Sequence, residues 1–482
     1  MSLTAPPPQS IVIFGASGDL AKRKIIPALY NICCDELLPE RFAIVGYART
    51  EWSEEEFMAH AREAIEQFSR TPFDEVHWKK FSGLLHYVSG EFHQPHCFSH
   101  LIEELDHLDS DLSLDGRRLY YCATPPPAFE LIVRRLGEAG NPGDPRIVIE
   151  KPFGHDLASA RDLNKIVHEV FDESRVFRID HYLGKETVQN ILLFRFANSM
   201  FERLWNSDAI DHMQITVAED LGVEGRGEYY EQAGAIRDIL QNHVLQVLAF
   251  LAMEPPRSLE PEGIRDEKVK LLRAVHPFRT EDVVRGQYAT CEVDGKTVPG
   301  YHEEEGVAKD STTETYAAVR AHIDNWRWSG IPVYLRTGKR LPRRTTQVIV
   351  FFRDAPGYLF EGAGIPTGVA DHISIEVQPD EGISLAFNAK EPGPEMTVKP
   401  VHMNFSYAEA FGAEPAEAYE RLLHEAMEGD HTLFIREDEV ERAWEIVQPI
   451  LDDPGRVHPY PAATWGPEEA IELIAPRRWH LH

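Results

Sequence analysis

A short apolar run that ends in glycines constrains the fold of this chain more than any other feature. Residues 11–14 form a fully apolar predicted strand, which stops at Gly15-Ala16-Ser17-Gly18-Asp19, and a helix is predicted from 20 to 33. Glycines after a strand let the backbone approach a diphosphate, and a helix N-terminus offers free N–H groups and a partial positive charge. The pattern is not a complete G-x-G-x-x-G, so a turn that simply needs small residues remains an alternative.

The rest of the first 180 residues repeats this alternation of short apolar runs and helical patterns. Further strands are predicted at 42–45, 119–123 and 146–150, and each ends in a loop of unusual composition. Such an alternation is typical of a parallel sheet with crossover helices, which binds its ligands where the strands end. We therefore expect a Rossmann-like dinucleotide-binding domain over residues 1–179.

Beyond about residue 178 the pattern changes. Partly alternating strands are predicted at 210–219, 315–323, 347–353, 372–378 and 383–388, with few helices between the last four. This spacing favours a large, mostly antiparallel sheet. Helices are predicted at 234–253, 414–428 and 437–450. The expected architecture is α/β plus α+β: a second α+β domain over residues 180–482 binds substrate and forms oligomers, with the active site between the two domains.

The end of the second strand bears on the choice of dinucleotide. An NAD site expects an acidic residue there for the ribose 2′-hydroxyl, whereas NADP needs a cation for the 2′-phosphate. Arg49 stands at that position, and Glu51 follows it closely. We expect NADP as the cofactor and NAD as a possible secondary one; an exposed Arg49 without a ligand is the alternative.

Charge and composition exclude several classes of protein. The 49 basic and 79 acidic residues give a net charge of -30, which opposes general binding to nucleic acid or to anionic membranes. The five cysteines follow no disulfide pattern, residues 1–10 lack the features of a signal peptide, and no run of about 18 apolar residues occurs. We therefore expect a cytoplasmic protein. The histidines of residues 93–100 are expected on a surface loop, and no metal is expected.

A polar segment at Arg178-Ile179-Asp180-His181-Tyr182-Leu183-Gly184-Lys185-Glu186 precedes an amphipathic helix. A cation, an imidazole and a phenol near a helix start suit a phosphate. A polar loop with a capped helix explains the same residues. The predicted helix 234–253 holds a second polar cluster that includes Asp238 and His243, but His243 falls on its apolar stripe. A histidine in such a place is usually a core residue, and spacing alone assigns it no catalytic role.

Six motifs occur in one order along the chain. They are Gly15-Ala16-Ser17-Gly18-Asp19-Leu20-Ala21-Lys22-Arg23-Lys24, Glu150-Lys151-Pro152-Phe153-Gly154, the segment 178–186, Gln241-Asn242-His243, Asp324-Asn325-Trp326-Arg327-Trp328 and Leu335-Arg336-Thr337-Gly338-Lys339. This series resembles that of the glucose-6-phosphate dehydrogenases, and the match spans nearly the whole chain. The resemblance implies oxidation of β-D-glucose 6-phosphate at C1 to 6-phosphoglucono-1,5-lactone with NADP, the first step of the pentose phosphate pathway, by a homodimer or homotetramer.

The resemblance also implies a role for each matching residue. His243 would be the general base at the C1 hydroxyl, oriented by Asp180. Substrate contacts are implied for His181, Tyr182, Lys185, Lys151, Glu219, Asp238, Lys339 and Arg344. Cofactor contacts are implied for Gly15, Ser17, Gly18, Asp19, Leu20, Lys24, Arg49, Tyr121, Pro125 and Lys151. Two rivals are a related oxidoreductase for an unphosphorylated sugar and a catalytically silent NADP-binding regulator.

Overall fold

The computed structural model describes residues 5–293, 295–356, 370–412 and 417–480. Residues 414–416 of the predicted helix 414–428 lie outside the described residues. The chain forms two compact units. The first comprises Met1–Gly184, Arg257–Arg265 and Ala416–Glu441, and the second comprises Lys185–Pro256, Asp266–Pro415 and Arg442–His482. The first stretch of unit 1 thus ends five residues beyond the predicted boundary, and two later segments join it.

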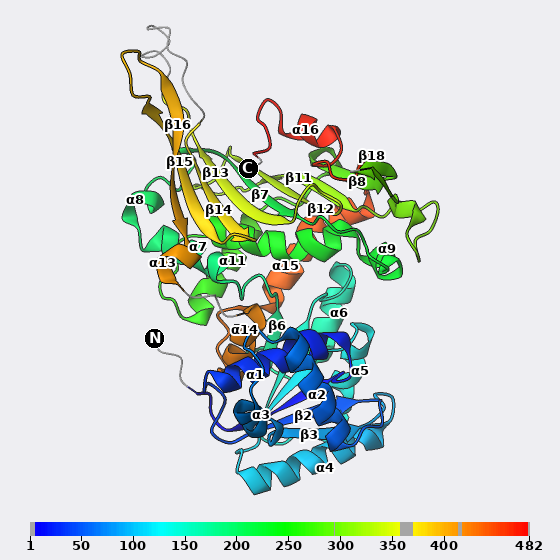
Figure 1. Ribbon diagram of the computed structural model, residues 1–482. Coiled ribbons are helices and arrows are strands. Elements are labelled where there is room, and N and C mark those ends of the chain that lie inside the picture. The colour runs from blue at the N-terminus through cyan, green and yellow to red at the C-terminus, as the bar shows by residue number, and fades with distance from the viewer. Residues whose placement is uncertain (1–4, 294, 357–369, 413–416, 481–482) are drawn as a thin grey trace. The chain divides into compact units, whose positions relative to one another are not determined.

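The first unit is built on a seven-stranded sheet. Its strands are β1 (Gln9–Phe14), β2 (Phe42–Ala48), β3 (Leu85–Ser89), β4 (Arg117–Cys122), β5 (Asp144–Glu150), β6 (Val176–Ile179) and β17 (Phe434–Ile435). They lie in the order β17-β6-β5-β4-β1-β2-β3, parallel except for β17 on β6 (Figure 1). The order reverses between β1 and β4, where open parallel sheets bind ligands. The predicted Rossmann-like sheet is confirmed.

Helices cover this sheet through apolar faces. They are the π-helical η1 (Ala21–Ile25), α1 (Ile26–Cys34), α2 (Glu54–Phe68), α3 (Glu75–Ser82), α4 (Pro95–Leu112), α5 (Pro127–Ala139), α6 (Leu157–His168), the short η2 (Glu173–Arg175) and α14 (Ala418–Glu428). In α5 the buried residues Phe129, Ile132, Val133 and Leu136 follow helical spacing. The surface loop expected at 93–100 is wrong: α4 begins at Pro95, a residue that suits the first turn of a helix because its missing N–H is not needed there.

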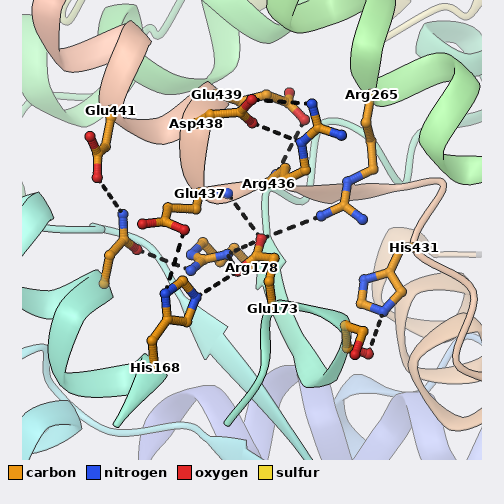
Figure 2. A network of polar contacts seen from close by, with 12 residues as sticks. His168, Glu173, Arg178, Arg265, His431, Arg436, Glu437, Asp438, Glu439 and Glu441 are labelled. Carbon is orange, nitrogen blue, oxygen red and sulfur yellow. Dashed lines mark hydrogen bonds and ion pairs between the residues drawn. The ribbon is translucent and has the colours of Figure 1, made fainter.

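A polar network around Glu173 joins the three chain segments of unit 1 (Figure 2). Both Glu173 carboxylate oxygens accept from Arg178 Nη1, at 2.8 and 2.9 Å. The same carboxylate accepts from the Glu437 backbone N–H at 3.0 Å and from Arg265 Nη2 at 3.5 Å. The His168 ring lies 3.0 Å away. Burial opposes ionisation, but the Arg178 charge and these hydrogen bonds lower the pKa of Glu173. The network ties β6 to the later segments.

The second unit holds a nine-stranded, largely antiparallel sheet, as predicted. Its order is β16-β15-β14-β13-β7-β12-β11-β8-β18, and only the pairs β7–β12 and β8–β18 are parallel. The strands are β7 (Ile210–Ala218), β8 (Val283–Ala289), β11 (Tyr316–His322), β12 (Pro332–Gly338), β13 (Thr345–Phe352), β14 (His372–Gln378), β15 (Gly382–Lys390), β16 (Val398–Ser406) and β18 (Val457–Pro461). A separate hairpin joins β9 (Cys291–Val293) and β10 (Lys296–Val298).

Helices of this unit pack on the sheet or on one another. They are α7 (Glu186–Phe196), α8 (Ser199–Glu202), α9 (Gly227–Ala235), the π-helical η3 (Ile236–Val244), α10 (Leu245–Ala252), η4 (Thr280–Asp282), η5 (Tyr301–Glu303), α13 (Tyr407–Phe411) and α16 (Glu469–Ile474). Two more, α11 (Pro261–Ala274) and α15 (Glu437–Asp452), begin in the first unit and end in the second. The η3 segment contacts β7, β11 and β12. Among the described residues, no helix is long and apolar enough to cross a membrane.

Candidate active site

The glycine loop after β1 is shaped by close backbone contacts. Gly15 has φ +84°, and a Cβ there would lie 2.6 Å from the carbonyl oxygen of Ala123, the residue after β4. Gly18 N–H donates to the Gly15 carbonyl at 2.9 Å, and the helix begins at Asp19. Only glycine fits position 15, because the loop sits tightly at the reversal point of the sheet. This is the local geometry of a diphosphate-binding turn.

The loop after β2 lies beside the glycine loop. Thr50 Oγ1 donates to Ser17 Oγ at 3.1 Å, and Tyr87 donates to the Thr50 carbonyl at 2.6 Å. Arg49, next to Thr50, is exposed, as is Glu51. Arg49, the predicted cation for the 2′-phosphate, is therefore the direct sequence neighbour of Thr50, which contacts the predicted diphosphate loop.

Other predicted cofactor residues have protein partners. Asp19 pairs with Arg23 at 2.6 Å, and Lys24 pairs with Glu417 at 2.9 Å. Tyr121 is fully buried in β4, whereas Pro125 is exposed in the loop that follows β4. Leu20 lies in the first turn of the helix, partly buried. Apart from Tyr121, these residues follow the ends of the adjacent strands β1 and β4.

Asp180 follows β6 directly and is 1% exposed. Its Oδ1 accepts the Tyr182 backbone N–H at 2.9 Å, and its carbonyl accepts the Leu183 N–H at 2.9 Å. A short acidic side chain that bonds the amide two residues on stabilises a tight turn. The turn fixes Asp180 and the neighbouring His181 at the carboxyl end of a parallel strand.

The start of α14 packs against this turn. The rings of His181 and Tyr419 lie nearly parallel, with centroids 6.5 Å apart. A Cβ on Gly184 would lie 2.8 Å from the Ala418 carbonyl oxygen. The glycine of the segment 178–186 is therefore required by close packing against a segment far along the chain.

A buried carboxyl that sequence reasoning did not single out stands at the end of β5. Glu150 Oε1 accepts from the Tyr121 hydroxyl at 2.5 Å, and Tyr419 also hydrogen-bonds this carboxyl. Burial raises the pKa of Glu150 to about 7, against the hydrogen bonds of the two phenols and the charge of Lys151, while the charge of Asp180 adds to the rise. This carboxyl precedes Lys151, a predicted substrate and cofactor residue.

Lys185 begins the second unit and stands just before α7. Its Nζ donates to Gln378 Oε1 at 2.7 Å. The same amide is oriented by Thr346, whose hydroxyl accepts from Gln378 Nε2 at 3.0 Å. The ammonium of the predicted phosphate lysine thus donates to a neutral amide, and its charge also acts on the Glu381 carboxyl.

Glu219 and Lys339 form one cluster in the second unit. Lys339 Nζ lies 2.5 Å from Glu219 Oε2 and 5.0 Å from the centre of the Tyr230 ring. Burial, followed by the charges of Asp238 and Glu219, raises the pKa of Tyr230 well above its usual value. Three predicted sugar-binding residues therefore surround one buried phenol. Arg344 lies apart from these contacts, exposed just before β13.

Asp238 and His243 both lie on η3. Asp238 is partly buried and hydrogen-bonds Tyr229. His243 is fully buried, as its place on the apolar stripe predicts, and Asn242 Oδ1 accepts its backbone N–H at 2.6 Å. A π-helical segment is uncommon and often marks a functional site. Burial alone does not separate a core histidine from a base.

In the second unit Glu219, Asp238 and Lys339 share one cluster around Tyr230, whereas Arg344 lies apart from it. The structure adds four residues that sequence reasoning missed: Glu150, Tyr419, Gln378 and Tyr230. Glu150 could have been noted as the acid of the Glu-Lys-Pro turn. The other three gain their place only through contacts between segments distant in sequence.

Comparison with protein families finds two adjoining matches. The model described as "Glucose-6-phosphate dehydrogenase, NAD binding domain" matches residues 12–190. The model described as "Glucose-6-phosphate dehydrogenase, C-terminal domain" matches residues 192–480. Together the two models cover nearly all of the chain.

Whole proteins give the same result. "Glucose-6-phosphate 1-dehydrogenase 2" of Mycobacterium tuberculosis is 46% identical over 477 residues, which is 97% of this chain and 93% of the relative. The structure of glucose-6-phosphate 1-dehydrogenase from Mycobacterium avium has a TM-score of 0.88 at 41% identity and 99% coverage of both chains. A structure of glucose-6-phosphate dehydrogenase in complex with its substrate glucose-6-phosphate has a TM-score of 0.91 at 36% identity, with both chains fully covered.

Proposed function

The chain belongs to the glucose-6-phosphate dehydrogenase family, and we propose that it oxidises β-D-glucose 6-phosphate at C1 to 6-phosphoglucono-1,5-lactone with NADP, as the first step of the pentose phosphate pathway. The single observation that carries the proposal is the full-length similarity, which includes the structure in complex with glucose-6-phosphate. The free state of all five cysteines supports a cytoplasmic setting.

The residues at the glycine loop fit a dinucleotide. No Cβ fits at Gly15, the helix starts at Asp19, and Arg49 offers an exposed cation beside Thr50. Backbone N–H groups of the loop would hold the diphosphate, and Arg49 would hold the 2′-phosphate. The nicotinamide, when bound, supplies the acceptor for the hydride from C1. NAD would be a secondary cofactor.

His243 acts in this proposal as the general base. It takes the proton of the C1 hydroxyl as the C1 hydride leaves, and Asp180 orients the ring and stabilises its cationic form. A base with a pKa near neutral is needed because the hydroxyl is a very weak acid at pH 7. Glu219, Asp238, Lys339 and Arg344 bind the sugar.

The phosphate, which is remote from the reacting carbon, supplies binding energy for positioning C1. His181, Tyr182 and Lys185 bind it, with Lys151 between substrate and cofactor. An enzyme for an unphosphorylated sugar would have no use for such a lysine.

The test is NADPH formation followed by absorbance with glucose 6-phosphate, glucose, NADP and NAD. His243→Asn should lower kcat by about 10²–10⁴-fold and leave glucose 6-phosphate binding largely intact, since a general base contributes about that much. Near-normal turnover would remove His243 from this role. Lys185→Ala should raise KM for glucose 6-phosphate by roughly 10–100-fold, the usual worth of a charge-assisted bond, and change turnover of glucose far less. Equal effects on both sugars would favour the unphosphorylated-sugar rival.

A further inference from the structure

Glu314 and Thr315 are adjacent residues just before β11. Glu314 contacts the start of η3, which carries Asp238, and Thr315 contacts the backbone of Lys339, which pairs with Glu219. Both side chains are buried, Glu314 at 3% exposure and Thr315 at 0%. Neither residue has a role in the reaction described above, and a buried carboxylate is costly unless it is paired and hydrogen-bonded. The contacts of the Glu314 carboxylate therefore indicate its structural role.

Glu314 caps the N-terminus of η3, the helical segment that carries Asp238 and His243. The Ala235 N–H donates to the Glu314 carbonyl at 2.9 Å, and the Ile236 N–H donates to Glu314 Oε1 at 3.1 Å. The first amides of a helix have no partner within it and need an external acceptor. One residue, which lies distant in sequence and just before β11, supplies two acceptors here, and its negative charge suits a helix N-terminus.

The chain on both sides of this contact is fixed. Gly234 has φ +62° and separates α9 from η3, and a Cβ there would lie 2.4 Å from Glu314 Oε1. The other carboxylate oxygen, Oε2, accepts from Arg285 Nη2 at 2.7 Å and from Nε at 3.2 Å. Arg285 in turn donates to the Thr312 carbonyl at 2.7 Å. These contacts fix the Glu314 carboxylate in place, and the carboxylate in turn fixes the position of the first residues of η3.

Thr315 holds the other side of the cluster. Its carbonyl accepts the Lys339 N–H at 2.9 Å, and its hydroxyl lies 3.1 Å from the Tyr460 hydroxyl, which donates to the Lys339 carbonyl at 2.7 Å. Lys339 is the residue that pairs with Glu219. The two residues thus connect the backbone of Lys339 to the backbone that leads into Asp238.

We propose that Glu314 is a positioning residue of the reaction: by capping η3 it sets the place of Asp238 and His243 relative to Lys339 and Glu219. Glu314 does not touch the substrate in this proposal and acts through the helix start. The proposal rests on the proposed function for its kinetic consequences, although the capping itself is independent of the reaction.

The decisive comparison is Glu314→Ala with Glu314→Gln. The alanine variant loses the side-chain acceptor for Ile236 and should lower kcat/KM for glucose 6-phosphate by about 10–100-fold, because misplacements near 1 Å cost that much. The loss should include kcat and shift the acid limb of the pH profile of kcat/KM. The glutamine variant keeps an amide oxygen for Ile236 but turns its NH₂ toward the Arg285 guanidinium, so it should lose stability while retaining clearly more kcat/KM than the alanine variant.

Asp282→Ala provides the matched control. Asp282 is also a buried carboxylate of this unit, 2% exposed, and it accepts from Arg320 at 2.6 and 2.8 Å and from Arg279 at 2.8 Å. It should cost comparable stability in urea but leave kcat/KM and the pH profile unchanged. If Glu314→Ala does not fold, Glu314→Asp, whose carboxylate is one methylene short of Ile236, takes its place in the same comparison.

Hydrogen exchange at Ala235 and Ile236 separates this proposal from the proposed function. Exchange there should be faster in Glu314→Ala than in Asp282→Ala. Unchanged exchange, or a loss of kcat/KM no larger than in the Asp282 control, would overturn the positioning role. If wild-type protein does not oxidise glucose 6-phosphate, the proposed function fails while the exchange result still decides whether Glu314 sets the helix start.

Discussion

At the scale of single residues, Arg49 is the proposed determinant of the choice between NADP and NAD. It is exposed beside the contact between Thr50 and Ser17, and the exposed Glu51 follows two residues later. Arg49→Ala should raise KM for NADP by roughly 10–100-fold, the worth of a charge-assisted bond to phosphate, and change KM for NAD little. Steady-state kinetics with both cofactors measures this.

Glu51→Gln is the matched control for that variant. Removing the nearby negative charge should strengthen NADP binding modestly, in the opposite direction to Arg49→Ala. If Arg49→Ala weakens NADP and NAD in parallel, the 2′-phosphate assignment is wrong and Arg49 only supports the loop.

Glu150 gives a prediction about pH. Burial raises the pKa of this carboxyl to about 7 in the folded protein, whereas an unfolded Glu titrates near about 4.3. Between these values the folded state binds more protons, so this group lowers the stability as pH rises from about 4.3 to 7. Glu150→Gln removes this titration. The free energy of unfolding of the variant minus that of wild type should therefore be more favourable to the variant at pH 8 than at pH 5. Urea unfolding at both pH values measures it, and an unchanged difference would contradict the assignment.

At the scale of elements, the C-terminal segment is fastened to the sheet of the second unit. Asp211 in β7 accepts from Arg477 at 2.7 and 3.1 Å. Gln214, also in β7, bonds the Arg478 carbonyl and the His480 N–H, each at 2.9 Å. The Trp479 ring lies 4.2 Å from the fully buried guanidinium of Arg336 in β12. The last residues therefore stabilise the strands that lead to Glu219 and Lys339.

This fastening should fail in acid. The hydrogen bond from Arg477 lowers the pKa of Asp211 to about 2, against burial and with help from His212. A lowered carboxyl contributes stability above its unfolded pKa of about 3.9 and loses that contribution as pH falls toward 2. Asp211→Asn should therefore be less stable than wild type at pH 7, with a difference that shrinks below pH 4. Thermal unfolding across pH 2–7 tests this, and a constant difference would exclude the Asp211 charge as its source.

The strands with short, continuous apolar runs could be predicted from sequence, and β1, β2, β4 and β5 lie where the apolar runs indicate. In contrast, β16 was missed because its edge position leaves residues such as Lys399, Pro400 and His402 exposed, which hides any apolar pattern. The predicted helix 234–253 starts at the non-helical Gly234 and is helical from there on, but its first half is η3, whose π-helical turns a 3.6-residue period does not describe.

In the candidate site too, some residues can be predicted from local sequence patterns and others cannot. His181, Tyr182 and Lys185 are adjacent in sequence, so a motif could identify them together. Tyr419 stacks on His181 from the far end of the chain, and no local pattern reports that contact.

At the scale of the whole molecule, the predicted homodimer or homotetramer remains a prediction. In the second unit Leu193 and Met403, which are 57% and 62% exposed, line the same apolar groove, and such exposed apolar surface favours association. Sedimentation velocity should give at least a dimer, and Leu193→Glu with Met403→Glu should shift it toward monomer. Val76→Glu, at an exposed apolar residue of the first unit, is the control that should not. A monomeric wild type would contradict this prediction.

The three-segment construction of unit 1 has a consequence for synthesis on the ribosome. Domains commonly fold in order as they emerge. Here the bond from Arg265 to Glu173 needs residue 265, and the Tyr419 contact, β17 and the bond from the Glu437 amide need residues 419–437. Unit 1 therefore stays incomplete until most of the chain has been synthesised. A fragment of residues 1–184 alone would lack β17 and leave the edge of β6 unpaired on that side.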